Sequence, residues 1–176
     1  YTMPIGSTDW WDLNIGFLIG LTLLFVASYK AKEKRLTWIS WILAIIIGGN
    51  HIAGHIEALM NNVWEAKTHL PFHLCSFSAI LSVFFLITRM QWTYEFLIFW
   101  SAGAIHAFIT PEITDGDSVF NRWEFGIAHG GIIATSFFAT IKLGFRPRVK
   151  SWLKVFAFTQ LTLPVVGLIN YLLGSN

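Results

Sequence analysis

The segment TWISWILAIIIGGNHIAGHIEAL, residues 37–59, is apolar along almost its whole length. An α-helix needs about 20 such residues to cross the hydrocarbon core of a bilayer, and a single segment pairs its own backbone groups there only as a helix. Five further apolar runs lie at about 13–29, 71–88, 95–110, 124–142 and 152–173. The sequence therefore predicts an all-α polytopic membrane protein, a bundle in which residues 1–176 form one domain of six transmembrane helices.

The overall composition supports this fold class. Of the 176 residues, 55% are hydrophobic and only 12% are charged, whereas soluble domains carry about 25% charged residues. No basic stripe with interleaved aromatic residues predicts nucleic-acid binding, so we expect membrane lipids as partners and leave protein partners open. We also expect the first apolar run to stay in the mature protein, because a basic loop and no small-residue cleavage site follows it.

Basic residues are concentrated in alternate loops. Ten of the twelve lie on one side, namely Lys30, Lys32, Lys34, Arg35, Arg89, Lys142, Arg146, Arg148, Lys150 and Lys154. The other side holds Lys67 and Arg122 with most of the acidic residues. The positive-inside rule places the basic loops in the cytoplasm. Both ends of this chain are then predicted to be extracytoplasmic.

Ionisable residues within the apolar runs gather near the outer surface. With this topology, a group of residues from different helices falls within roughly 10–15 Å of that surface: His51, His55, His73, Cys75, His106, His129 and Asn170. Ionisable side chains are costly in a bilayer and commonly mark functional sites, so we predict that these residues share one site. Gln160 is the main polar group expected in the inner half. His69 is expected to be a loop residue outside the site.

Cys75 is the natural nucleophile of such a site. It follows Pro71, and proline is favoured in the first turn of a helix, where the helix dipole stabilises a thiolate. His73 is two residues away, which is about 200° around a helix, so its side chain points away from the thiol. The partner base is therefore expected from another helix, with His129 and His106 as candidates.

His51 and His55 also support a different function. Residues four apart share a helix face, and together with His106 or His129 they would form a histidine-rich site for zinc or another transition metal. The spacing alone is a weak signal, because the intervening residues lack the glutamate of the HExxH metalloprotease motif. Elemental analysis of the purified protein distinguishes this metal-binding or transport protein from an enzyme that uses no cofactor.

Four segments match a known family in their order and spacing. They are LPFHLCSFSAIL (70–81), GAIHAFITPEI (103–113), FGIAHGGIIAT (125–135) and GLINYLLGSN (167–176). They resemble the YwaF-like family of bacterial integral membrane proteins, which is related to transmembrane protein 164 of eukaryotes, a polytopic phospholipid acyltransferase with a catalytic cysteine. The resemblance implies a place in the bacterial cytoplasmic membrane, Cys75 as the carrier of an acyl thioester, and His129 as its base. His55, His73 and Asn170 match further polar positions of the motifs.

The leading hypothesis is an intramembrane lipid acyltransferase, or a lipid ester or thioester hydrolase, that acts in the outer leaflet. Cys75 would attack the ester carbonyl, and His129 would transfer the proton. The oxyanion or the lipid headgroup would be bound by His55, His73, His106 and Asn170. The metal-binding protein is the second hypothesis. A non-catalytic subunit of a membrane complex is the third.

Overall fold

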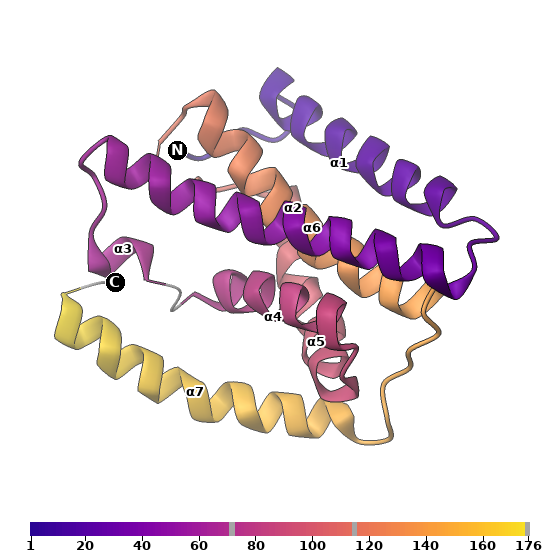
Figure 1. Ribbon diagram of the computed structural model, residues 1–176. Coiled ribbons are helices and arrows are strands. Elements are labelled where there is room, and N and C mark those ends of the chain that lie inside the picture. Colours follow the sequence, from indigo (N-terminus) through magenta and orange to yellow (C-terminus); the bar gives the residue numbers. More distant parts are fainter. Residues whose placement is uncertain (71–72, 114–115, 175–176) are drawn as a thin grey trace.

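The computed structural model describes residues 1–70, 73–113 and 116–174 (Figure 1). These ranges contain seven helices: α1 (Thr8–Ala27), α2 (Glu33–Met60), α3 (Ala66–His69), α4 (Leu74–Thr88), α5 (Gln91–Ile109), α6 (Val119–Ile141) and α7 (Ser151–Leu173). Within the described ranges, an isolated bridge between Thr2 and Glu112 is the only strand-like pairing. The all-α prediction is therefore confirmed. Pro71, expected to start a helix, lies outside the described residues, and α4 begins at Leu74.

Four of the helices begin four or five residues before the apolar runs that predicted them. In α1 and α6 the reason is a capped polar turn. The side chain of Ser7 accepts a hydrogen bond from the backbone N–H of Trp10 at 3.2 Å. Ser118 does the same for the backbone N–H of Asn121 at 3.0 Å. Such caps satisfy donors that the first turn leaves unpaired, so a helix can begin in polar sequence, outside the apolar run.

Four helices, α1, α2, α6 and α7, are long and apolar enough to cross a membrane. The chain is therefore an integral membrane protein. Each of the two remaining apolar runs also forms a helix: α4 is apolar but only 15 residues long, and α5 has 19 residues. The six runs recognised in the sequence thus correspond to six helices. The short α3 lies in the connection between α2 and α4.

Helix α6 lies at the centre of the bundle and packs against α1, α2, α4 and α5. Its glycines allow this close approach. A Cβ added at Gly126 would lie 2.8 Å from Leu13, and one added at Gly130 would lie 2.9 Å from Phe17, both on α1. Small residues let transmembrane helices come together, because the backbones can touch without side chains between them.

Changing Gly131 to alanine tests this packing. A Cβ at that position would lie 2.7 Å from Cγ1 of Ile47 on α2, and Ile47 is itself fully buried. Because the isoleucine has no free space to move into, we expect Gly131→Ala to destabilise the fold by about 1–3 kcal/mol. Thermal unfolding in detergent measures this loss. The matched control is Gly49→Ala on α2, which meets no atom within 4 Å. Equal melting temperatures for the two variants would contradict the packing described here.

Helix α7 is the most peripheral of the long helices, and Figure 1 shows it on the opposite side of the bundle from α1. Its buried residues, Ser151 and Val155, both lie in its first two turns. There it packs on α5, where Trp100 Nε1 donates to Thr159 Oγ1 at 3.0 Å. Its far end approaches α3. The C-terminal half of α7 therefore contacts the rest of the bundle mainly near its last residues.

A buried carboxylate lies at the end of the bundle near the α6–α7 connection, where the sequence predicted none. Glu95 on α5 accepts hydrogen bonds from Nε and Nη2 of Arg148, both at 2.8 Å, and from the Arg148 backbone N–H at 2.9 Å. The hydrogen bonds that Arg148 donates to Glu95 also raise the pKa of the Arg148 guanidinium. Gln160, the polar group expected in this half, is exposed instead. Glu95 was overlooked because it stands at the edge of its apolar run.

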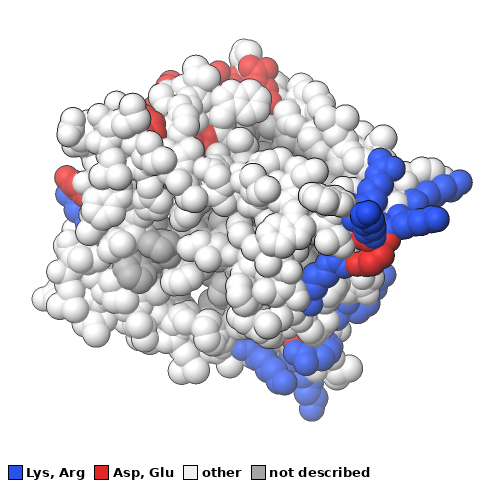
Figure 2. Space-filling model, viewed as in Figure 1, with Lys and Arg blue, Asp and Glu red and all other residues white. Residues whose placement is uncertain are grey.

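The charged side chains separate toward the two ends of the molecule (Figure 2). Most Lys and Arg residues lie around the α1–α2 and α6–α7 connections. The acidic residues of that end form ion pairs: Glu33 pairs with Arg89, and Glu95 pairs with Arg148. At the other end Arg122 pairs with Asp9 at 2.6 Å. The basic end therefore carries a net positive charge.

Candidate functional site

Two of the predicted histidines lie together in the C-terminal part of α2, with two residues that the sequence did not assign to the site. The rings of His51 and His55 are 5.0 Å apart and nearly perpendicular. The ring of His69 on α3 lies 6.5 Å from that of His55, and Trp64 stacks on His69 at 6.0 Å. We call these four residues the outer histidine cluster. His69 thus lies in a short helix beside the site, and the prediction that it is a loop residue was wrong.

Trp64 sets the tautomer of His55. The indole Nε1–H donates to His55 Nδ1 at 3.1 Å. An indole nitrogen can only donate, so Nδ1 of His55 must be the acceptor, and a neutral ring then carries its proton on Nε2. His55 consequently presents an N–H donor on its free side. Such a donor can stabilise the negative charge of a thiolate or an oxyanion. It cannot act as a base, because Nε2 already carries a proton.

Cys75 lies on the inward face of α4. It is the second residue of that helix, and it shares its face with the buried residues Ala79, Ser82 and Leu86. The thiol is half-buried against the main core. His73 is the exposed N-cap residue of the same helix. Within the described residues, no hydrogen bond joins the thiol to an imidazole, so Cys75 meets the core without a fixed base.

The contact between α2 and α4 places Cys75 at the level of His55. A Cβ at Gly48 of α2 would lie 3.6 Å from Val83 of α4, so these two residues face each other. From this contact His55 lies seven residues outward on α2 and Cys75 lies eight residues outward on α4, about 10–12 Å in each case. Seven residues are nearly two full turns, so His55 points toward α4 as Gly48 does.

His129 lies deeper than Cys75 and faces a different helix. Gly131 abuts Ile47, which places His129 level with about Gly49, or about 10 Å below the level of Cys75. The residue one heptad further along α6, Ser136, donates to the carbonyl of Leu97 on α5 at 3.2 Å, so this face of α6 is directed at α5. The cysteine and this histidine are thus on inward faces at different depths.

The hydrogen bond of His129 gives it the opposite tautomer to His55. Its Nδ1 lies 3.0 Å from the carbonyl oxygen of Phe125, and its ring packs on the Phe125 ring at 4.1 Å. A carbonyl oxygen can only accept, so Nδ1 carries the proton and the Nε2 of the neutral ring keeps its lone pair. This arrangement is suited to a general base whose orientation is fixed by the backbone.

The remaining predicted residues lie apart from these contacts. His106 is exposed on α5, on the face opposite the buried residues Ala104 and Phe108. Asn170 is half-buried on the outer part of α7. Among the described residues, neither of them makes a hydrogen bond or ring contact with the outer histidine cluster.

A polar contact between α2 and α6 also escaped the sequence analysis. Asn50 Nδ2 donates to the backbone carbonyl of Glu124 at 3.1 Å and to its carboxylate at 3.5 Å. Gly54 faces the same side chain, because a Cβ there would lie 3.5 Å from Glu124 Cγ, an ordinary van der Waals contact. The sequence feature that could have indicated this contact is a glutamate at the start of an apolar run. This contact joins α6 to α2 next to the outer histidine cluster.

The metal hypothesis required three or more ligands in one place. Among residues 1–70, 73–113 and 116–174, no group of three His, Cys, Asp or Glu side chains is arranged to hold a metal ion. His51 and His55 are neighbours, whereas His106 and His129, their predicted co-ligands, are on other helices and face other surroundings. The four residues do not form one cluster.

Comparison with known proteins places the chain in a family. A stretch of 63 residues, 36% of this chain, is 30% identical to an uncharacterized protein of Treponema pallidum (strain Nichols), of which the match covers 26%. This chain thus aligns with about a quarter of that relative. No solved structure matches the chain. The TMEM164 family matches residues 6–176, which is almost the entire sequence and includes every site residue described above, and this chain therefore belongs to the TMEM164 family.

Proposed function

We propose that this protein is a membrane-lipid acyltransferase that works through a thioester on Cys75. The observation that carries the proposal is the placement of this thiol: it is on the inward face of α4, at the level of His55, whose helix face is the one that Gly48 turns toward α4. A donor at that position stabilises negative charge on sulfur or on a carbonyl oxygen. Membership of the TMEM164 family is consistent with this chemistry.

The proposed topology has six membrane crossings, with α4 and α5 crossing as well as the four longer helices. The basic connections lie in the cytoplasm, and both ends of this chain are extracytoplasmic, as the positive-inside rule requires. The membrane is the bacterial cytoplasmic membrane. Cys75 and the outer histidine cluster then lie in the outer leaflet, near the depth at which phospholipid esters are found.

The reaction proceeds in two steps. The Cys75 thiolate attacks the carbonyl carbon of a lipid ester, and the bond from that carbon to the alcohol oxygen breaks. The lysolipid leaves as an alcohol after it takes a proton from the base, and the acyl group stays on sulfur. In the second step an acceptor hydroxyl, of a lysolipid or of water, attacks the thioester, and its proton passes to the base as the thiolate leaves.

We assign the base to His129, whose Nε2 lone pair is available. The separation of about 10 Å in depth requires either a chain of waters or an inward shift of the first turn of α4 when the lipid binds, since catalytic hydrogen bonds often tighten only in the complex. His55 supplies the donor to the oxyanion. His73, His106 and Asn170 are proposed to contact the lipid headgroup.

An acyl adduct on Cys75 is the expected result of incubating the purified protein with phospholipid. Mass spectrometry of the intact protein should show a mass increase of one acyl chain, and hydroxylamine, which cleaves thioesters, should remove it. Peptide mapping should place the adduct on the peptide that contains Cys75. An adduct that survives in Cys75→Ala, or no adduct under conditions in which acyl transfer proceeds, contradicts the covalent route.

The proposed reaction needs no cofactor. The metal-binding alternative is favoured by one observation, the proximity of the His51 and His55 rings at 5.0 Å. It also requires ligands from outside this pair. Stoichiometric zinc, copper or iron in the purified protein would support it over the acyltransferase.

A further inference from the structure

An apolar groove with a cation at one end lies between α1 and the end of α6, far from Cys75. It has a volume of about 540 Å³ and is lined by Leu21, Thr22, Phe25, Val26, Tyr29 and Lys142. The groove is shallow and open along one side, where Val26 and Tyr29 are exposed. From Leu21 to Tyr29 it follows the chain for about 12 Å. Its apolar lining suits part of an acyl chain.

Lys142 is held at the polar end of the groove by aromatic rings. Its Nζ lies 5.7 Å from the ring centre of Phe25 and 6.0 Å from that of Tyr29. A cation over a ring face is attracted to it and keeps N–H donors on its other side. The two acidic residues of this end, Glu33 and Glu95, are already paired with arginines. Among the described residues, Lys142 has no carboxylate partner, so an anion must come from outside.

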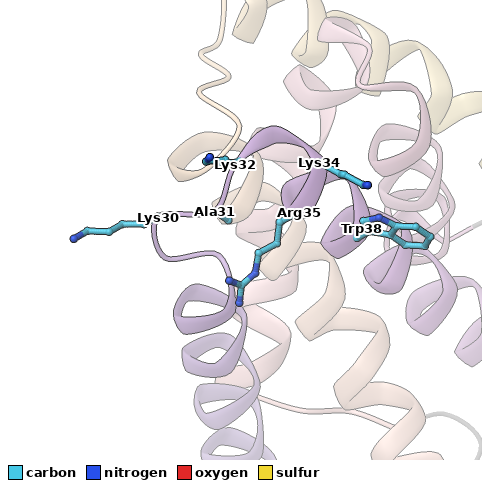
Figure 3. A pocket seen from close by; sticks show the side chains of 6 residues that line it. All are labelled: Lys30, Ala31, Lys32, Lys34, Arg35 and Trp38. Atoms are coloured by element: carbon cyan, nitrogen blue, oxygen red, sulfur yellow. The ribbon is translucent and has the colours of Figure 1, made fainter.

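The neighbouring α1–α2 connection adds positive charge but does not form a closed anion site. Lys30, Lys32, Lys34 and Arg35 line a second hollow with Ala31 and Trp38. Figure 3 shows that their side chains point in different directions instead of converging on one centre. They therefore raise the local concentration of anionic lipid without fixing one headgroup. Trp38 is exposed at the same end, where tryptophan marks the membrane interface.

We infer that the groove between α1 and α6 binds one anionic phospholipid of the leaflet on the basic side. The acyl chain lies along Leu21, Phe25 and Val26, and the phosphate accepts hydrogen bonds from Lys142. The combination of an apolar groove and an unpaired cation at its membrane-surface end is what selects a lipid over a soluble anion. This site is at the opposite end of the bundle from Cys75 and does not depend on the proposed acyl transfer.

Native mass spectrometry of the full chain in detergent tests this inference. The probes are phosphatidylglycerol and phosphatidylcholine with identical acyl chains, which differ in net charge. The wild-type protein should retain phosphatidylglycerol preferentially. Lys142→Gln should reduce that preference about fivefold, since one basic residue near an anionic headgroup contributes about 1 kcal/mol. Lys142→Arg should keep it. Val26→Trp, which fills the groove, should weaken the binding of both lipids.

The matched control is Lys154→Gln, which removes an exposed cation from α7 at the same end of the molecule. Its preference for phosphatidylglycerol should equal that of the wild type. Equal losses in Lys142→Gln and Lys154→Gln would overturn the inference, because the preference would then be a general effect of net charge. Displacement of the bound lipid by glycerol phosphate alone, or unchanged binding in Val26→Trp, would overturn it as well.

Discussion

Replacing Cys75 with alanine is expected to reduce acyl transfer at least about a thousandfold, because a covalent mechanism cannot proceed without its nucleophile and only binding and oxyanion stabilisation remain. The measurement is the transfer of a labelled acyl chain between phospholipid and lysolipid in liposomes that contain the purified protein. The acyl adduct on the protein should disappear in the same variant. Because the thiol is only half-buried, the loss of packing in Cys75→Ala should be small compared with the loss of rate.

Ser76→Ala is the control for this experiment. Ser76 is the next residue of α4, is also half-buried, and lies about 100° around the helix from Cys75. It should transfer acyl chains at the wild-type rate. An unchanged rate in Cys75→Ala would remove the thioester mechanism. A loss of similar size in both variants would show that the first turn of α4 affects the rate through its structure and not through the Cys75 sulfur.

His129→Gln is expected to lower the rate of acyl transfer by about 10²–10⁴-fold, the range typical for loss of a general base. Glutamine keeps a polar group of similar size near Phe125 but offers no nitrogen lone pair. In the wild type the rate should level off above the pH at which the base has lost its proton. In His129→Gln the rate should instead keep rising into alkaline pH, because the thiolate then forms only as hydroxide increases. The measurement is the rate–pH profile of both proteins in the same liposomes.

Two further variants separate this role from a structural one. Thr135 lies on the same helix as His129, and its buried hydroxyl has no hydrogen-bond partner among the described residues. Thr135→Val should therefore keep the rate and the pH profile of the wild type. His55→Gln removes the proposed oxyanion donor. It should lower the rate but keep the plateau of the pH profile. If the plateau is instead lost in His55→Gln and kept in His129→Gln, the assignment of the base to His129 is wrong.

The helices themselves could be predicted from the sequence, because the cost of leaving backbone groups unpaired in lipid depends only on the local run of apolar residues. All six runs form helices, and the family match covers the segments around Cys75 and His129. The short α3 was not predicted, since four residues between two apolar runs carry no periodicity. Nor was the burial of Glu95, because its partner Arg148 is 53 residues away.

The sequence by itself determined which side of each helix is polar and which end of the bundle is basic. The helical period places Cys75 on the same side of its helix as Ala79, Ser82 and Leu86, and loop composition places the cations. Only the tertiary structure decided the depth of one helix relative to another. The contacts of Gly48 with Val83 and of Gly131 with Ile47 bring Cys75 level with His55 and leave His129 deeper. Such offsets depend on which side chains fit together between helices, and no single apolar run contains that information.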